Sequence, residues 1–314
     1  MSTIRLLEAV PNFSEGRDAA VVADIVSAMR AAGAHVLDWS ADADHHRSVV
    51  TVVGAPDAVE EAAFAAARVA IERIDLRTHA GVHPRVGALD VLPFVPLAGL
   101  TLEDARTSAR RVGARIAAEL GVPVFFYGAA SDPPGRVLSE LRAGGFEALQ
   151  QDWPADRVPD LEPRHASRTG VHPSAGVTCV GARRLLLAWN VYVDGIDFAT
   201  ARRIAAGIRQ SGGGLSGVRA LALQLPIAGR MQISINLEDV ELTSPMEVFR
   251  RIEDAVLAEH GRIDETEVIG MLPDQLVWSA AADRLKLAPD TARRMLSQRL
   301  VDILTRHEPS SQDT

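Results

Sequence analysis

The order of predicted strands and helices repeats along the chain, and this repeat restricts the fold more than any other feature. Apolar residues recur with the spacing of a strand, a helix, two strands, a helix and a strand at Ile4–Val10, Ala19–Ala32, His35–Ser40, Ser48–Val53, Asp57–Ile74 and Val86–Phe94. The same order returns at Arg184–Val193, Phe198–Gln210, Val218–Leu225, Arg230–Leu237, Pro245–His260 and Glu265–Met271. Such an order forms an antiparallel sheet backed by two helices, the ferredoxin-like unit. We therefore expect an α+β protein in which two ferredoxin-like (βαββαβ) subdomains pack with a ligand cleft between them.

Between the two repeats, the chain first adds elements and then loses its regular pattern. A helix at Leu102–Leu120, a strand at Val122–Tyr127 and helical material at Arg136–Gln151 extend the first unit. The following segment, Asp152–Val177, contains four prolines and little apolar periodicity. A long irregular segment inside a compact protein is more often functional than a simple linker, so we expect it to carry part of the site.

The end of this irregular segment gives the expected domain boundary. We place an N-terminal subdomain at 1–177 and a C-terminal subdomain at 178–314. The second unit ends in a helical tail, Asp274–Thr305, and the last residues, Glu308–Thr314, are expected to be disordered.

Composition excludes several classes of protein. The net charge of −8 argues against nucleic-acid binding. The single cysteine, Cys179, allows neither an intramolecular disulfide nor a cysteine-based zinc site. The single lysine, Lys286, leaves almost no residue for Schiff-base chemistry. No stretch reaches the ~18 apolar residues of a membrane span, and the N-terminus does not have the pattern of a signal peptide, so we expect a cytoplasmic protein.

The segment Thr78–Ala88 is the strongest candidate for chemistry. Its glycines and a proline require a tight, non-helical path between a helix and a strand. His83 and Arg85 stand two residues apart in it. An imidazole titrates at about pH 6.5 and can pass a proton at neutral pH, while an arginine can hold an anion beside it. This pairing suits acyl-type transfer to an amine; the alternative is a histidine that only stabilises the turn.

Metal binding is a rival interpretation of the same histidines. His79 and His83 are four residues apart, and Asp42–His46 forms a second polar cluster. On a helix, histidines at this spacing can share a zinc ion. Gly81 and Pro84 make a helix improbable, and no acidic base stands between the histidines. We therefore expect no metal.

Three shorter features are weaker signals. The turn that ends in His46 and Arg47 is either a polar turn or a contact for a substrate carboxylate. The segment Val10–Gly16 leads into the first helix, whose N-terminal amides favour anions. Gly-Val-His-Pro occurs at Gly81–Pro84 and again at Gly170–Pro173, which is either chance or a sign that His172 faces the same cleft.

Two long motifs, Val10–Gly16 and His83–Phe94, resemble the glutamate formimidoyltransferase family. The resemblance continues in family order through Gly121–Val124, Arg142–Gly144, Gly181–Arg183, Asn190, Gln232–Leu237 and Val268–Pro273. It covers nearly the whole chain up to about Pro273, without the cyclodeaminase domain that follows in two-domain relatives.

The resemblance implies an activity and a set of site residues. Members transfer the formimidoyl group of N-formimidoylglutamate to tetrahydrofolate, a co-substrate, during histidine breakdown, and some use the formyl analogue. The resemblance implies two ferredoxin-like subdomains around a cleft and His83 as the catalytic residue. The implied substrate-binding residues are Asn12, His46, Arg47, His79, Arg85, Gly87, Arg183, Asn190, Gln232, Ser234 and Asn236. The implied folate contacts are Glu162, Pro163, His172 and Gly176. The partners are then small molecules, and a homodimer is expected from the family and the alanine-rich helices.

The chain departs from the family pattern at several positions. Val82 replaces a glutamate before His-Pro-Arg, and His46 replaces an asparagine. Gly145–Phe146 replaces Glu-Tyr, and Leu161–Glu162 stands in a changed folate loop. The alternatives are therefore a folate-dependent transferase with a different donor, or a folate-binding homologue without catalysis.

Overall fold

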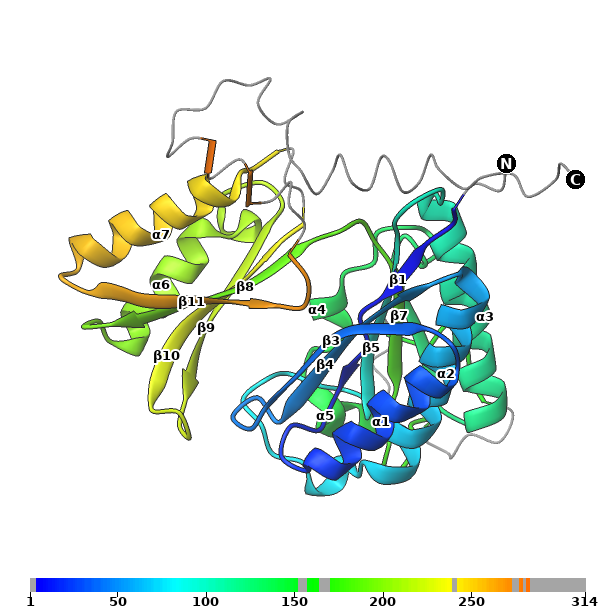
Figure 1. The fold of residues 1–314 in the computed structure, drawn as a ribbon. Helices are drawn as coiled ribbons and strands as arrows, with labels where there is room; N and C mark the ends of the chain where they lie inside the picture. Colours follow the sequence, from blue (N-terminus) through cyan, green and yellow to red (C-terminus); the bar gives the residue numbers. More distant parts are fainter. Residues whose placement is uncertain are drawn as a thin grey trace, which may run out of the picture.

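The computed structural model describes residues 4–151, 157–163, 170–238, 242–272, 277–278 and 281–282. Within these residues the chain forms a mixed α/β structure with two separate sheets (Figure 1). The protein is therefore α+β, as the repeated order of elements predicts. Most of the expected tail helix Asp274–Thr305, and all of Glu308–Thr314, lie outside the described residues.

The first sheet contains the strands of the N-terminal half. Their bounds are β1 (Leu7–Ala9), β2 (Asn12–Phe13), β3 (His35–Asp42), β4 (Arg47–Gly54), β5 (Leu89–Pro96), β6 (Val124–Gly128) and β7 (Thr178–Ala182). β4 pairs with β3 on one side and with β1 and β2 on the other, and β1 and β2 pair in turn with β5. These pairings are antiparallel, whereas β5–β7 and β7–β6 are parallel.

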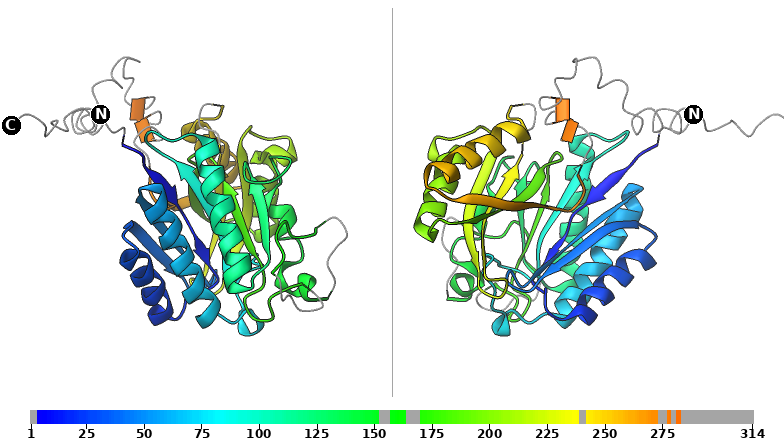
Figure 2. Two further views of the ribbon diagram at one scale, coloured as in Figure 1. Left: turned by 90° about the vertical axis from the view of Figure 1, so that its right-hand side faces the viewer. Right: turned by 60° about the vertical axis from the view of Figure 1, so that its left-hand side comes forward.

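Three long helices pack on one face of this sheet, as Figure 2 shows. They are α1 (Ala19–Ala31), α2 (Pro56–Arg73) and α3 (Leu102–Leu120). Asp18 caps the first backbone amides of α1, and Thr101 and Asp104 form a capping box at the start of α3, which explains where both helices begin. The short elements η1 (Leu76–Thr78), α4 (Leu138–Leu141) and α5 (Gly145–Gln151) join the long elements.

The second sheet has the strand order β11-β8-β10-β9, and every pairing in it is antiparallel. Its elements are β8 (Leu187–Asp194), α6 (Phe198–Ile208), η2 (Gln210–Gly212), β9 (Val218–Leu225), β10 (Arg230–Leu237), α7 (Pro245–Ala258) and β11 (Arg262–Ile269). Residues of α6 and α7 such as Ile204 and Val256 bury an apolar core against one face of this sheet. On the opposite face, Tyr192, Leu223 and Leu225 pack against Val82 of the first unit.

Two predicted strands differ from the structure for local reasons. Of the expected strand Ile4–Val10 only Leu7–Ala9 forms a strand, and a second short strand, Asn12–Phe13, follows Pro11, which has no backbone N–H. The strand expected from Val86 begins only at Leu89, because the amides of Val86 and Gly87 donate to the side chain of Asp90 instead of to a neighbouring strand.

Candidate active site

Two loops of the first unit meet at the edge of the cleft. One is the turn between β3 and β4, and the other, residues 79–88, links η1 to β5. A Cβ added to Gly81 would lie 2.4 Å from the carbonyl oxygen of His45, and one added to Gly16 would lie 2.2 Å from that of Asp42. Gly81 is therefore required for loop 79–88 to approach the β3–β4 turn this closely, and Gly16 for the segment after β2 to approach the end of β3.

His83 is held by a hydrogen bond at each ring nitrogen. Nδ1 lies 2.8 Å from the carbonyl oxygen of Pro84. A carbonyl oxygen can only accept, so Nδ1 carries the proton. Nε2 then keeps its lone pair and accepts from Nη1 of Arg47 at 3.2 Å. The partners thus assign a neutral imidazole whose basic nitrogen faces a guanidinium.

The surroundings of His83 favour this neutral form. Burial lowers the pKa of His83 well below its ordinary value of 6.5. The positive charges of Arg47 and Arg142 and the ring of His45 lower it further, against the hydrogen bond to Pro84, which raises it. At pH 7 the ring is therefore neutral, with a lone pair on Nε2.

Arg47 is an unusual arginine because it is enclosed. Its Nη2 donates to Oδ1 of Asn12, while its Nε is buried and has no hydrogen-bond partner in the described structure. Burial, and next the charge of Arg142, lower the pKa of Arg47 to about 10, although Asp90 and Asp42 oppose the shift. The guanidinium remains charged at pH 7 and has an unused donor.

A buried ion pair supports this part of the site. Oδ1 of Asp90 accepts from the amides of Val86 and Gly87 at 2.8 and 3.3 Å, and its Oδ2 accepts from Nη2 of Arg142. Asp90 is only 3% exposed. The carboxylate therefore holds the backbone just after His83 and places the charge of Arg142 near the ring.

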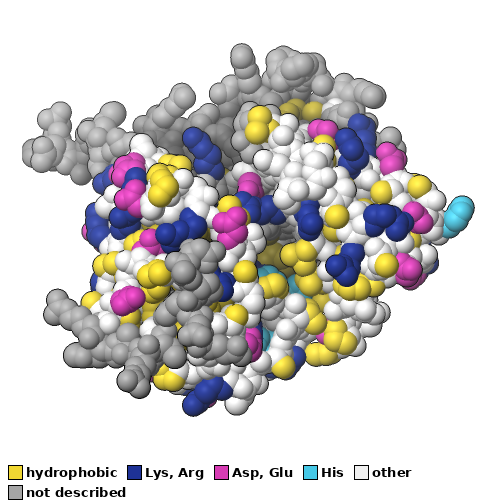
Figure 3. Space-filling model, turned by 180° about the vertical axis from the view of Figure 1, so that it is seen from behind, with side chains coloured by type: hydrophobic (Ala, Val, Ile, Leu, Met, Phe, Trp, Pro, Cys, Tyr) yellow, Lys and Arg dark blue, Asp and Glu magenta, His cyan; other side chains and the backbone are white. Residues whose placement is uncertain are grey.

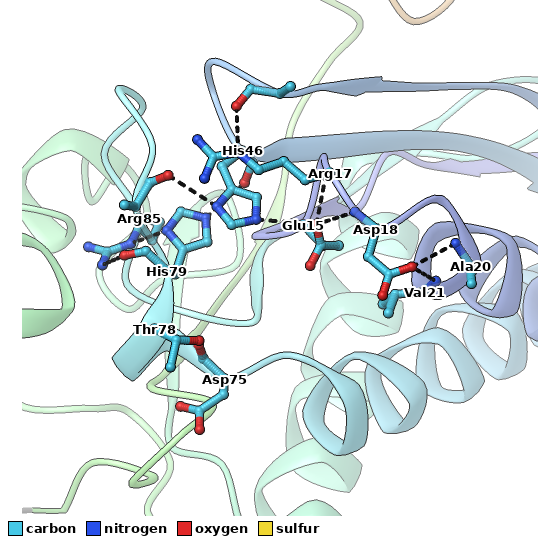
Figure 4. A network of polar contacts seen from close by, with 12 residues as sticks. Glu15, Arg17, Asp18, Ala20, Val21, His46, Asp75, Thr78, His79 and Arg85 are labelled. Atoms are coloured by element: carbon cyan, nitrogen blue, oxygen red, sulfur yellow. Dashed lines mark hydrogen bonds and ion pairs between the residues drawn. The ribbon is translucent and has the colours of Figure 1, made fainter. Parts of the chain in front are cut away.

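His46 and His79 join the two loops through stacked rings, as Figure 4 shows. Their ring centroids lie 4.1 Å apart, with 8° between the planes. Nε2 of His46 lies 3.2 Å from Oε1 of Glu15, and its Nδ1 lies 3.1 Å from the carbonyl oxygen of Ala80. Nε2 of His79 donates to the carbonyl oxygen of His46 at 2.8 Å. His46 has a left-handed backbone with φ of 49°, a conformation that asparagine and histidine adopt more readily than most residues.

Arg85 does not present free donors to the cleft. Its Nε donates to Nδ1 of His79 at 2.9 Å. Its Nη1 and Nη2 form two parallel bonds to the carboxylate of Glu147 in α5, at 2.9 and 2.7 Å. With each nitrogen bonded to a protein acceptor, Arg85 fixes loop 79–88 against α5 in this structure.

The second unit reaches the same place through one hairpin and one strand. Both oxygens of Asp44 accept backbone amides of the β9–β10 hairpin, from Ile227 at 2.7 Å and Ala228 at 2.8 Å. The amide of Gln232 in β10 lies 3.2 Å from Nε2 of His45, and the His45 ring lies 5.8 Å from that of His83. Figure 3 shows that the surface is hollowed between the two units, with apolar and histidine side chains in the hollow.

The polar residues of the second sheet lie on its face opposite α6 and α7. Gln232, Ser234 and Asn236 alternate along β10, and Asn190 of β8 lies opposite Ser234. The amide of Asn190 donates to Oε2 of Glu267 at 3.1 Å, and the hydroxyl of Tyr192 donates to the same oxygen at 2.9 Å. This face turns toward the first unit, because Gln232 on it meets His45.

The other predicted residues are Gly87 in loop 79–88, four residues of the irregular segment, and Arg183. Gly87 pairs with Gly176 through an isolated bridge, and an added Cβ at Gly87 would lie 1.9 Å from the carbonyl oxygen of Val177. Nδ1 of His172 accepts from the amide of Ala175 at 3.0 Å. Arg183 follows β7, and its charge lowers the pKa of Glu8, which burial raises by a larger amount. Glu162 and Pro163 follow Leu161, which forms an isolated bridge to Val124 of β6. Glu162 and Pro163 do not line the cavity at His83.

A small cavity lies among the residues of the two loops. Its volume is about 10 Å³, which is room for about one water-sized group. Five predicted residues, His46, Arg47, His79, His83 and Arg85, line it together with four that were not predicted, Phe13, Ser14, His45 and Asp90.

Sequence reasoning missed several residues that shape the site. Asp90 and Arg142 stand inside the recognised motifs, and His45 stands in the polar cluster, but nothing in the sequence assigned them a contact. Tyr192 and Glu267 gave no signal apart from their positions in predicted strands. Among the described residues, no group of three or more histidine, cysteine, aspartate or glutamate side chains could hold a metal ion.

The chemistry of the site defines a class of protein. A neutral imidazole can accept and return a proton, and a guanidinium beside it can hold an anion or a developing negative charge. A site of this kind is typical of enzymes that transfer a group between substrates with acid–base assistance. No helix in the described part of the chain is long and apolar enough to cross a membrane.

The chain belongs to the formiminotransferase family. The family model "Formiminotransferase domain, N-terminal subdomain" matches residues 6–183, and "Formiminotransferase domain" matches residues 188–288. The chain is 37% identical over 284 residues to the glutamate formimidoyltransferase of Streptococcus pyogenes serotype M1, covering 88% of this chain and 92% of that protein. It is 37% identical over 294 residues to the glutamate formimidoyltransferase of Thermoplasma acidophilum, covering 90% and 93%. The formimidoyltransferase-cyclodeaminase of Rattus norvegicus is also 37% identical, and there the match covers 52% of the relative.

Proposed function

We propose that this enzyme transfers a formimidoyl group from N-formimidoyl-L-glutamate to N5 of tetrahydrofolate. The observation that carries the proposal is the unprotonated Nε2 of His83, which faces Arg47 at a cavity of about 10 Å³. The glutamate formimidoyltransferases that resemble this chain over nearly their whole length support the same reaction.

In the proposed mechanism, His83 carries one proton between two nitrogens. As N5 of the folate forms its bond to the formimidoyl carbon, Nε2 of His83 accepts the proton that N5 loses. As the bond between that carbon and the glutamate nitrogen breaks, the same proton passes from His83 to the departing nitrogen. The hydrogen bond of Nδ1 to Pro84 keeps the ring oriented through both steps. One acid–base residue of this kind contributes about 10²–10⁴-fold to the rate.

The arginines of the site divide into two proposed roles. Arg47 has a buried Nε without a partner in the described structure, and this donor is suited to a substrate carboxylate or to charge on the reacting group. Arg183 is proposed to hold a second carboxylate. Arg85 already bonds Glu147 and His79, which supports a role in positioning the His83 loop.

The remaining predicted contacts are proposed as the walls of the substrate site. Four of them share the face of the second sheet opposite α6 and α7, namely Asn190, Gln232, Ser234 and Asn236. This arrangement supports their role as polar contacts to substrate. The folate is proposed to lie against the irregular segment that contains Glu162, Pro163, His172 and Gly176.

We also propose that both units are ferredoxin-like. The orders β3-β4-β1-β5 and β11-β8-β10-β9 support this, since each places the first strand of its unit between the third and the fourth. β7 (Thr178–Ala182) pairs with β5 and β6 in the first sheet, which supports a domain boundary after β7 instead of the expected one at 177/178.

The pH dependence of turnover follows from the low pKa of His83. The neutral ring is the base, so kcat/KM should be at its plateau at pH 7 and should fall only in acid, below pH 6.5. The unfolded chain binds a proton at this histidine near pH 6.5 and the folded chain does not. Stability is therefore also lost as the pH falls from 6.5 toward the folded pKa. A profile of kcat/KM between pH 5 and 9, about the range in which histidine titrates, checks this; an acid limb centred above pH 7 would contradict it.

The direct test is an assay with purified protein, N-formimidoyl-L-glutamate and tetrahydrofolate, followed by the absorbance of the folate product and by release of glutamate. We expect both products in equal amounts. Binding of tetrahydrofolate without release of glutamate would exclude this donor and favour a different donor or a non-catalytic protein. A control assay without folate separates transfer to folate from simple hydrolysis of the donor.

A further inference from the structure

We infer that Glu267 binds the positively charged formimidoyl group of the donor and makes the enzyme prefer it to a neutral formyl group. This inference rests on the proposed function and extends it to a residue of the second unit.

Glu267 lies on the face of the second sheet that turns toward His83. In β11 it pairs with Asn190 of β8, which pairs in turn with Ser234 of β10. Gln232 and Tyr192 form the neighbouring residue pair on the same face of the sheet. The side-chain amide of Gln232 contacts Nε2 of His45. The exposed carboxylate of Glu267 therefore lies on the same face of the second sheet as Gln232, which contacts the loop that carries His45.

Two neutral donors orient this carboxylate. Asn190 and Tyr192 both donate to Oε2, at 3.1 and 2.9 Å. The guanidinium of Arg230 lies over the Tyr192 ring, 3.9 Å from its centroid. Tyr192 also belongs to an apolar cluster against which Val82, the residue before His83, packs. A carboxylate held by such a residue is preorganised for a ligand nearby.

Glu267 differs in its charge balance from Glu15, Glu147 and Asp90. Glu15 pairs with His46, Glu147 with Arg85 and Asp90 with Arg142. Within the part of the chain that the structure describes, Glu267 forms no such ion pair, and its Oε1 has no hydrogen-bond donor. Its negative charge is thus not paired with a described cation, whereas Asp42 and Asp44, the other acids near His45, are bonded by backbone amides.

A formimidoyl group needs such a partner, whereas a formyl group does not. Attached to the glutamate nitrogen, the formimidoyl group is an amidine, which is protonated at neutral pH and presents two N–H groups like one edge of a guanidinium. A carboxylate matches that edge in charge and in geometry. A formyl group is neutral and offers a carbonyl oxygen, which a carboxylate repels. Arg47 alone would favour the formyl group, so Glu267 supplies the opposite preference.

The test compares the two donors in the variant Glu267→Gln, which keeps the size of the side chain. With tetrahydrofolate as acceptor, kcat/KM for N-formimidoyl-L-glutamate should fall about 10- to 150-fold, the loss expected for one hydrogen bond between charged groups. The value for N-formyl-L-glutamate should stay within about threefold, which corresponds to less than one weak hydrogen bond. If the unaltered enzyme does not turn over the formyl compound, its inhibition constant against the formimidoyl donor replaces that value.

The matched control is Asp264→Asn, an exposed acid three residues earlier in β11 that bonds Arg262. It should leave both donors unchanged. An equal loss for both donors in Glu267→Gln, or no loss for either, overturns the inference, since both outcomes mean that Glu267 does not sense the charge of the donor. Absence of turnover in the unaltered enzyme would instead contradict the proposed function, so the two failures are distinguishable.

Discussion

Replacing His83 with alanine is expected to lower kcat about 10²–10⁴-fold while the protein remains folded. The imidazole is the group whose basic nitrogen is unprotonated and faces the cavity, so its loss removes the proton carrier from both steps of transfer. His83 is not part of the buried apolar core, so the fold should tolerate the change. Steady-state turnover gives the effect on rate, and circular dichroism with thermal unfolding checks the fold.

The matched control for this prediction is His35→Ala. His35 is an exposed histidine at the start of β3, away from the cavity lining, and its replacement should leave kcat unchanged. Turnover of the His83→Ala protein within about twofold of the unaltered enzyme would remove His83 from the mechanism, since acid–base residues contribute far more than that.

The largest expected effect on stability comes from Asp90→Ala. This change leaves the guanidinium of Arg142 without its ion-pair partner and the amides of Val86 and Gly87 without their acceptor. Breaking one partner of a buried pair typically costs about 3–5 kcal/mol, because a buried charge is left uncompensated. The free energy of unfolding should fall by that amount in urea titrations, and activity should fall with it because loop 79–88 loses its anchor.

A surface pair provides the comparison for Asp90. Glu259→Ala removes an exposed pair with Arg203, and pairs of this kind contribute about 0.2–1 kcal/mol. A second change, Arg142→Met in the Asp90→Ala background, removes the uncompensated charge and should restore part of the stability. If Asp90→Ala costs no more than Glu259→Ala, the Asp90–Arg142 pair does not stabilise the folded loop.

The main helices and several strands were predictable from the sequence because they bury one face with a regular period. The expected helices Ala19–Ala32 and Leu102–Leu120 agree with α1 and α3, and the expected strand Arg230–Leu237 agrees with β10. β7 was missed, and its burial explains why. All five residues of Thr178–Ala182 are buried, because the strand lies between β5 and β6 with both faces covered, so it lacks the alternation that marks a half-exposed strand.

The sequence by itself indicated the loop that is proposed to carry the chemistry. The glycines and proline around His83 restrict the backbone locally, and the motif that contains them defines the family. Only the tertiary structure decided what each polar side chain there contacts. Arg85 bonds Glu147, 62 residues away, and Asp90 bonds Arg142, 52 residues away. Glu267 comes to the cleft only because β11 pairs with β8. Local periodicity records which face of an element is buried, but the partner of a charged group is chosen by packing between elements distant in the chain, and no local pattern contains that information.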